Sequence, residues 1–249
     1  MNTTPKTMVL TGASRGIGHA TVKRFSAEGW RIITCSREAV PEACKRDPNW
    51  SAHIPTDLSD QASVEAFVDE ALDILRKEPL HALINNAAVS PKTSFKERLG
   101  CLNGGIDRWR EVFELNLFTP LELCRGFAGA LSRGAKQGGA SVVNITSIAG
   151  HEIHPFAGSA YSTSKAALSA LTREMAVEFA DLGVRVNAVA PGEIETEMIG
   201  EEYEPLINRI PMHRMGTPDE VASCVFQLCS GDFSYVTGTE VFVTGGQHL

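Results

Sequence analysis

The fold of this chain is decided near its amino terminus, by the segment Thr7-Met8-Val9-Leu10-Thr11-Gly12-Ala13-Ser14-Arg15-Gly16-Ile17-Gly18. The short apolar run at its start is typical of a buried strand, and the glycines that follow permit a tight turn. A helix is predicted directly afterwards, from Ile17 to Glu28. The glycines also let the backbone approach a pyrophosphate, which the unpaired N–H groups of the helix start would bind. Taken alone, the same spacing also fits a plain structural turn.

Strand-like and helix-like segments alternate along the rest of the chain. Further apolar runs predict strands at 31–35, 51–54, 81–84, 140–145, 184–189 and 241–243. Helices are predicted at 63–77, over 107–133 with a bend or restart at Pro120, at 161–182, and after Thr217, where Thr-Pro-Asp-Glu predicts a capping box. Apolar strands separated by helices indicate a parallel sheet that is covered on both faces.

We therefore predict one α/β domain over residues 1–249, doubly wound and Rossmann-type, with a parallel seven-stranded sheet and helices on both faces. Two long loops follow predicted strands, at about 87–106 and 193–210. Because doubly wound sheets bind ligands beyond the carboxyl ends of their strands, these loops are expected to contact substrate.

Composition narrows the classes of partner. The chain has 249 residues, of which 43% are hydrophobic, and a formal net charge of −7. This charge argues against a nucleic-acid or anionic-membrane partner, since both need a basic face. The start of the chain lacks the apolar stretch of a signal peptide, and no apolar run is long enough for a membrane span. Six cysteines without CxxC spacing indicate reduced core residues. We expect a soluble, cytoplasmic protein.

The pair Tyr161 and Lys165 predicts acid/base chemistry. Four residues apart in a helix, the two side chains lie on one face, where an ammonium favours the phenolate. A free phenol titrates near ~10, and hydride transfer to a carbonyl makes an alkoxide that needs a proton as it forms. Ser147 follows the apolar run 140–145, upstream of this pair.

These motifs together resemble the short-chain dehydrogenase/reductase family, in its compact subtype of roughly this length. The glycine segment has the spacing TGxxxGxG, Asn85-Asn86-Ala87 is similar to the family's NNAG, and Tyr161 with Lys165 forms YxxxK. The resemblance implies hydride transfer between a nicotinamide and a carbonyl or secondary alcohol of a small molecule. It also implies four catalytic roles: Ser147 bonds the substrate oxygen, Tyr161 exchanges the proton, Lys165 holds the nicotinamide ribose and lowers the tyrosine pKa, and Asn116 holds a proton-relay water.

The resemblance further implies which residues bind the cofactor. They are Gly12, Ser14, Arg15, Gly16, Ile17, Gly18, Ser36, Arg37, Asp57, Leu58, Asn86, Ala87, Tyr161, Lys165, Pro191, Gly192, Ile194 and Thr196. Asp57 would contact the adenine, or its segment caps a helix.

The end of the second strand selects between the two nicotinamide cofactors. An acid there would bind the ribose 2′-hydroxyl of NAD, but Ser36 and Arg37 occupy this position, and Arg15 stands in the glycine turn. Two guanidiniums and no acid favour NADP(H), although both arginines could simply be solvated.

The sequence leaves open the roles of three residues near the predicted site. Glu193 stands where the resembled family usually has an apolar residue, and either faces solvent or forms part of the pocket wall. His151 and His154 lie between Ser147 and Tyr161, in a segment one residue longer than the subtype's. Their spacing would suit a metal site only with a third ligand, which is not evident, so substrate contact or plain exposure is favoured.

Two other functions are compatible with the motifs. A 3-oxoacyl-carrier-protein reductase would dock an acidic carrier protein, for which Arg173 and Lys136 are the basic residues near the expected positions, but the net acidity opposes this. A non-catalytic NADP-binding sensor is the other. The resemblance also implies a homotetramer built on the helices at 107–133 and 161–182, in which the tail 245–249 could reach a neighbour's pocket.

Overall fold

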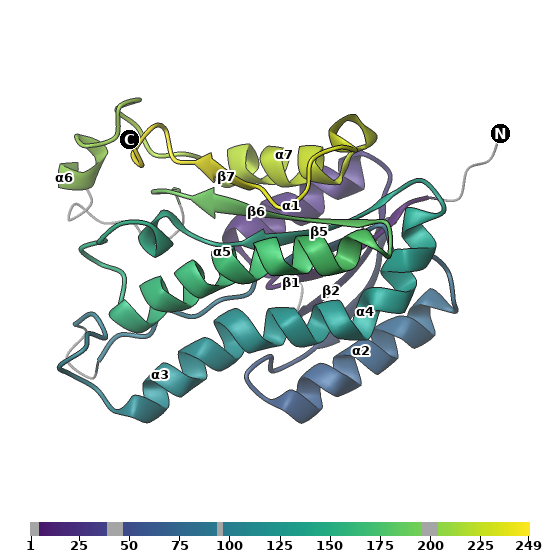
Figure 1. The fold of residues 1–249 in the computed structure, drawn as a ribbon, viewed down its shortest axis with the longest axis horizontal. Coiled ribbons are helices and arrows are strands. Elements are labelled where there is room, and N and C mark those ends of the chain that lie inside the picture. Colours follow the sequence, from purple (N-terminus) through teal and green to yellow (C-terminus); the bar gives the residue numbers. More distant parts are fainter. Residues whose placement is uncertain (1–4, 39–46, 94–96, 196–203) are drawn as a thin grey trace.

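A single parallel sheet runs through the molecule (Figure 1). The computed structural model describes residues 5–38, 47–93, 97–195 and 204–249. Seven strands pair in the order β3-β2-β1-β4-β5-β6-β7, and every pairing is parallel. The strands are β1 (Thr7–Thr11), β2 (Arg31–Ser36), β3 (Trp50–Pro55), β4 (Ala82–Asn85), β5 (Ala140–Ile145), β6 (Val184–Pro191) and β7 (Glu240–Val243). The predicted doubly wound, seven-stranded sheet is confirmed.

Helices cover both faces of this sheet (Figure 1). One layer contains α1 (Gly16–Ala27) and α7 (Pro218–Cys229), and the other contains α2 (Gln61–Leu75), α4 (Thr119–Ala135) and α5 (Ser159–Ala180). Two short helices, α3 (Ile106–Phe113) and α6 (Glu204–Ile207), complete the set within the described ranges. In the part of the chain that the structure describes, no helix has both the length and the hydrophobicity to cross a bilayer.

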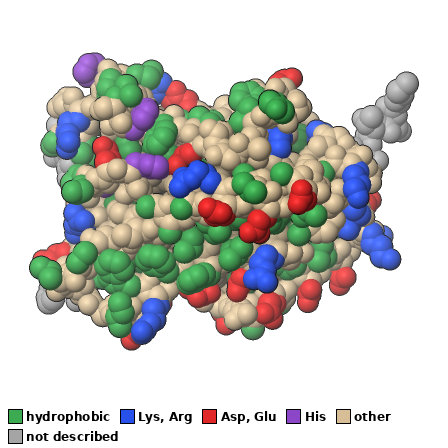
Figure 2. All heavy atoms as spheres, in the orientation of Figure 1, with side chains coloured by type: hydrophobic (Ala, Val, Ile, Leu, Met, Phe, Trp, Pro, Cys, Tyr) green, Lys and Arg blue, Asp and Glu red, His purple; other side chains and the backbone are tan. Residues whose placement is uncertain are grey.

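Alternating side chains of the strands supply two hydrophobic cores. Val9 and Ile33 pack into the core that includes Phe127, whereas their neighbours Leu10 and Ile32 belong to the core on the opposite face. This alternation follows from the two-residue period of a strand. On the α4–α5 side, Figure 2 shows hydrophobic side chains that remain at the surface over α3 and α4.

Local capping signals account for where the helices begin. At α7, Glu220 N donates to Thr217 Oγ1 at 3.3 Å and Thr217 N donates to Glu220 Oε2 at 2.8 Å, so the predicted capping box is confirmed. Helix α2 begins two residues before the predicted Ser63, because Asp60 accepts the Ser63 N–H and serves as its cap. Asp60, and not Asp57, is therefore the capping acid of this segment.

The helix predicted over 107–133 is interrupted by a wider turn. Helix α3 continues into a π-helical turn, Glu114–Phe118, and then into α4, where Pro120 lies in the first turn. The predicted restart at Pro120 is confirmed, but the sequence did not reveal the π turn. Such turns are frequent at functional sites, and this one carries Asn116.

The order of the strands indicates where in the fold a ligand site is expected. Strand β1 lies between β2 and β4, so the chain leaves the sheet in opposite directions on either side of β1. At such a switch point the loops diverge and open a crevice beyond the carboxyl ends of the strands. The loops that follow β1, β4, β5 and β6 all begin at this edge.

Candidate active site

The turn after β1 has room only for glycine at two positions. Gly12 has a φ of +73°, and a Cβ there would come within 2.9 Å of Asn86 Nδ2. A Cβ on Gly18, in the first turn of α1, would lie 2.0 Å from Gly12 O. The start of α1 is thereby held against the turn. The close approach of turn and helix agrees with the tight turn that the glycine spacing predicted.

The end of β4 clamps the same turn. Asn86 Nδ2 donates to Thr11 O at 2.9 Å and to Gly12 O at 3.0 Å. In return, Thr11 Oγ1 accepts the N–H groups of Asn86 and Ala87, at 3.1 and 3.0 Å. The NNA segment therefore fixes the shape of the glycine turn through side-chain hydrogen bonds.

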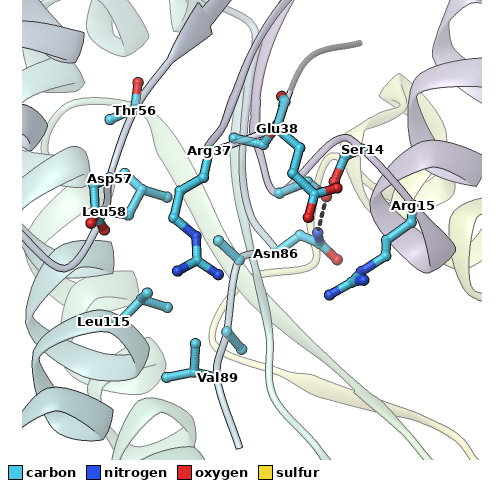
Figure 3. Close-up of a pocket in the computed structure, with 14 residues that line it drawn as sticks. Ser14, Arg15, Arg37, Glu38, Thr56, Asp57, Leu58, Asn86, Val89 and Leu115 are labelled. Atoms are coloured by element: carbon cyan, nitrogen blue, oxygen red, sulfur yellow. Dashed lines mark hydrogen bonds between the residues drawn. The ribbon is translucent and has the colours of Figure 1, made fainter. Parts of the chain in front are cut away.

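A cavity opens beside this clamp (Figure 3). It brings together nine of the predicted cofactor residues: Gly12, Ser14, Arg15, Ser36, Arg37, Asp57, Leu58, Asn86 and Ala87. The lining also includes Glu38, Thr56, Ala88, Val89 and Leu115, which the sequence prediction missed. This lining fits a dinucleotide. The glycine turn, the helix start and the two guanidiniums suit its phosphates, and the apolar wall at Leu58 and Leu115 suits its base.

The acid Glu38 corrects one part of the sequence prediction. Figure 3 shows the Arg15 and Arg37 guanidiniums extending toward the cavity, with the Glu38 carboxylate in the same space. The expectation of two guanidiniums and no acid is therefore wrong. Ser36 is buried, and its Oγ donates to Glu38 O at 2.7 Å, so the chain turns sharply after β2 and brings Glu38 to the lining. The sequence does contain a signal for this acid, because Glu38 stands only two residues beyond the end of β2.

Asp57 lies at the far end of the cavity from the glycine turn. Hydrogen bonds from the side chain and backbone of Ser59 hold the pKa of this carboxyl below its usual range, and the nearby Arg37 charge lowers it further. Asp57 Oδ1 accepts Ser59 Oγ at 2.7 Å and Ser59 N at 3.0 Å. The carboxylate is thus fixed, ionised and accessible at the place predicted for the adenine contact.

The predicted catalytic pair lies at the start of α5. Lys165 Nζ is 5.8 Å from the centre of the Tyr161 ring, as one helical turn requires. The lysine is only 2% exposed, and its Nζ donates to Ile145 O, at the end of β5, at 2.6 Å. The predicted geometry of one face is confirmed.

The electrostatics of this pair differ from the prediction. Burial lowers the pKa of Lys165 from 10.5 to about 7. Burial raises the pKa of Tyr161 above its ordinary 10.0; a hydrogen bond with Ser147 opposes this, and the Glu193 charge adds to it. Burial is the largest cause for both groups, and for Tyr161 it acts against the expected lowering of the tyrosine pKa.

Ser147 and Asn116 complete the predicted set. Ser147 lies two residues after the end of β5, and its Oγ accepts Ala149 N at 3.2 Å, which caps the short helical turn Ile148–Gly150. Asn116 is fully buried: its Oδ1 accepts Val89 N at 2.9 Å, and its Nδ2 donates to Val89 O and Ser164 Oγ, both at 3.0 Å. The Asn116 side chain thus ties the loop after β4 to α5.

The segment after β6 borders the same edge of the sheet. Gly192 N donates to Val243 O at 3.0 Å, and Ile194 forms a bridge with Gly216. Pro191, Gly192 and Ile194 do not line the cavity of Figure 3 but continue the row of strand ends beyond Ser147. Thr196, the remaining predicted cofactor contact, lies outside the described residues.

Glu193 and His154 turn out to be partners. Glu193 is buried, at 8% exposed, and His154 Nε2 lies 2.5 Å from its Oε1. Both solvent-facing alternatives are therefore wrong for these two residues. His151 is exposed and its Nε2 pairs with Glu240 Oε2 at 3.0 Å, so the two histidines contact different carboxylates and do not form a joint ligand set. The pairing links residues 39 apart, which no local pattern could reveal.

Comparison with known proteins agrees with this geometry. A family profile described as "Enoyl-(Acyl carrier protein) reductase" matches residues 12–248. Protein FixR of Bradyrhizobium diazoefficiens is 51% identical, over 98% of this chain and 87% of that protein.

Solved structures give the same result. An oxidoreductase of the short chain dehydrogenase/reductase family from Brucella ovis, in complex with a partially ordered NAD, is 46% identical, with 97% of this chain and 100% of that chain covered and a TM-score of 0.83. The RhlG/NADP complex of Pseudomonas aeruginosa is 30% identical, covers 98% and 96% of the two chains and has a TM-score of 0.86. Similar structures thus bind NAD or NADP, and the chain belongs to the short-chain dehydrogenase/reductase family of oxidoreductases.

Proposed function

We propose that this protein is an NADP(H)-dependent oxidoreductase that transfers a hydride between the nicotinamide and a carbonyl or secondary alcohol of a small molecule. The observation that supports this proposal is that Tyr161 and Lys165 share one face of α5 and that Ser147 follows β5, while the cavity built by the glycine turn opens at the same carboxyl edge of the sheet. A proton donor and a nucleotide site at adjacent strand ends are what carbonyl reduction needs.

Each residue of the set has a task in this reaction. A nicotinamide cofactor held by the residues of the cavity would supply the hydride for reduction and would accept it in oxidation. Ser147 Oγ bonds the substrate oxygen and holds it near the Tyr161 hydroxyl, with which Ser147 already shares a hydrogen bond. Tyr161 gives its proton to that oxygen in reduction and takes it back in oxidation. Its raised pKa keeps the phenol protonated near neutral pH, so it is ready to act as the acid.

Lys165 and Asn116 do not contact the reacting bond in this proposal. Lys165 acts through its charge, and Asn116 acts by positioning its neighbours. With a pKa of about 7, Lys165 carries its charge in only part of the molecules at neutral pH. A neighbouring anion, or ribose hydroxyls that accept from Nζ, would favour the charged form and thereby the phenolate. Asn116 positions Val89 at the cavity wall and fixes Ser164 in the turn that carries Tyr161.

The preference for NADP(H) rests on charge in the cavity. Arg15 and Arg37 are two permanent cations beside the position that an acid occupies when the ribose 2′-hydroxyl is bound. Glu38 opposes a 2′-phosphate, but one carboxylate faces two guanidiniums. Arginine also offers paired N–H groups that suit phosphate geometry, which favours NADP(H) over NAD(H).

The test is turnover with a defined panel. The purified protein is mixed with NADPH or NADH and either simple ketones or acyl thioesters, and the absorbance of the reduced cofactor is followed. The proposal expects loss of NADPH with at least one ketone and none in the Tyr161→Phe variant. Turnover only with acyl thioesters would identify a carrier-protein reductase instead. Cofactor binding without turnover on any carbonyl would identify a sensor and contradict the proposal.

We further propose that the chain assembles as a homotetramer through α4 and α5. Val177 on α5 is 75% exposed, and Phe118 at the start of α4 is also exposed, although both are large and apolar. Figure 2 shows hydrophobic side chains gathered over this face. An exposed apolar surface on long helices is favourable to bury against symmetry-related copies.

A further inference from the structure

The buried pair of Glu193 and His154 has a defined protonation pattern. His154 Nδ1 accepts two backbone N–H groups, from Phe156 at 3.2 Å and Ala157 at 3.1 Å. The ring proton therefore lies on Nε2, which donates to Glu193 Oε1 at 2.5 Å. A neutral imidazole bound to a carboxylate leaves the pair with one negative charge.

This charge sits beside the reacting groups. Strands β5 and β6 are neighbours, Ser147 follows the first and Glu193 follows the second. His154 lies on the segment that joins Ser147 to Tyr161, and the charge of Glu193 acts on the Tyr161 phenol. The backbone of Glu193 is fixed as well, because its carbonyl accepts Gly216 N at 2.9 Å. The carboxylate is therefore held rigidly at the edge of the site.

One oxygen of this carboxylate remains available. His154 occupies Oε1, whereas Oε2 has no hydrogen-bond partner among the described residues and is not one of the sealed, unpaired side-chain atoms. A carboxylate can accept about four hydrogen bonds, and partial burial of an unpaired oxygen is costly. If the pair served only to pin the loop, a neutral amide would do so without this cost. The open oxygen is explained if a ligand donates to it.

We propose that Glu193, held in place by His154, is a specificity-determining residue that accepts a hydrogen bond from a hydroxyl group on the carbon next to the reacting carbonyl. The substrate class is thus an α-hydroxy ketone, or a vicinal diol in the reverse direction, as in polyols and sugars. A carboxylate at the same place is repelled. This inference rests on the proposed function, since it concerns the substrate of that same site.

Three small probes of nearly equal size isolate this interaction. Hydroxyacetone carries the hydroxyl, butanone has a methyl group in place of that hydroxyl, and pyruvate has a carboxylate in place of the whole hydroxymethyl group. The quantity measured is kcat/KM for each probe with NADPH, in the unmodified protein and in Glu193→Gln. The control variant is Glu195→Gln, which removes the same charge two residues away from an exposed position.

The unmodified protein is expected to prefer hydroxyacetone over butanone by roughly tenfold to a hundredfold, the effect of a charge-assisted hydrogen bond. Glu193→Gln should remove most of this preference and raise the kcat/KM for pyruvate, relative to that for butanone, by about tenfold. Glu195→Gln should change neither ratio. Equal ratios in the unmodified protein and Glu193→Gln would overturn the inference and leave the proposed function intact.

Binding without turnover keeps the inference testable if the proposed function fails. The ring nitrogens of His154 are followed by ¹⁵N NMR while each probe is added to the cofactor-loaded protein. Hydroxyacetone should shift the Nε2 signal at concentrations where butanone does not, and this shift should be absent in Glu193→Gln. If no probe is reduced but this shift occurs, the reaction class is wrong and the recognition stands. If hydroxyacetone and butanone give the same response, the recognition is wrong.

Discussion

Lys165 Nζ donates a hydrogen bond of 2.6 Å to the carbonyl of Ile145, so the lysine of the predicted catalytic pair is anchored to the end of strand β5. This anchor places a cation 5.8 Å from the Tyr161 ring, in a site where Lys165 is almost fully buried. The position is useful for chemistry and unfavourable for stability, because an ammonium loses its hydration there. Functional sites often show this conflict.

The Lys165→Met variant should therefore stabilise the cofactor-free protein. The folded chain releases the Lys165 proton near pH 7, whereas the unfolded chain holds it up to about 10.5. Between these values the unfolded chain binds more protons, so the cost of burying the ammonium is complete below about pH 7 and vanishes as the pH approaches 10.5. We expect the free energy of unfolding to rise by roughly 2–4 kcal/mol at pH 6, allowing for the lost hydrogen bond. Denaturant unfolding should show a much smaller gain at pH 10, and a gain independent of pH would contradict this account.

The Tyr161→Phe variant should lose turnover and keep its cofactor. The hydroxyl transfers the proton, and removing such a group typically costs roughly 10²–10⁴ in rate. Cofactor affinity, measured by fluorescence titration, should change less than about twofold, since the ring and Lys165 remain. Tyr235→Phe is the matched control, because Tyr235 is fully exposed and adjoins Val236, which contacts the amino-terminal end of β6, opposite the carboxyl ends where the site lies. Retention of a tenth of normal activity in Tyr161→Phe would mean that another group supplies the proton.

The Arg37→Ala variant should weaken NADPH binding by roughly tenfold to a hundredfold and change NADH binding little, because the 2′-phosphate exists only in NADPH. Ser36→Asp should invert the preference, and Glu38→Gln should strengthen NADPH binding by removing a like charge from the cavity. Arg125→Ala, an exposed arginine on α4, serves as the control. Calorimetric titration of both cofactors would decide, and equal affinities in the unmodified protein would contradict an NADP(H) preference.

The Asn116→Ala variant should unfold more easily. It leaves Val89 N, Val89 O and Ser164 Oγ without the partners that Asn116 now supplies in a buried π turn. We expect a loss of roughly 2–4 kcal/mol in the free energy of unfolding, against about 1 kcal/mol for Ser164→Ala, which removes only one of the three bonds. Chemical denaturation compares the two variants. Unchanged stability in Asn116→Ala would show that these bonds do not hold the loop after β4.

The Val177→Glu variant should dissociate the proposed tetramer. A buried, unpaired carboxylate at an apolar contact costs several kcal/mol, enough to shift the assembly to dimers or monomers at micromolar concentration. Light scattering measures the mass, and Glu178→Gln on the next, exposed position is the control. A monomeric unmodified protein would remove this expectation altogether.

Much of the fold could be predicted because its signals are local. The turn at Gly12 needs a positive φ, the box of Thr217 and Glu220 caps a helix within four residues, and the spacing of Tyr161 and Lys165 sets their common face. Such features depend on a few consecutive residues, so the sequence determines them directly. The nine predicted residues that meet in the cavity follow from this, since strands of a parallel sheet end at one edge.

The tertiary structure alone decided the electrostatics of the site. The sequence placed Glu193 and His154 on separate loops, and only the packing of β5 against β6 makes them a buried pair. It also suggested a lowered pKa for Tyr161, whereas burial raises it. Desolvation and charge act through space and depend on every element packed around a group, so no short pattern encodes them. Residue types and their spacing determined what chemistry the chain could do, and the assembled fold determined the charge state in which it does it.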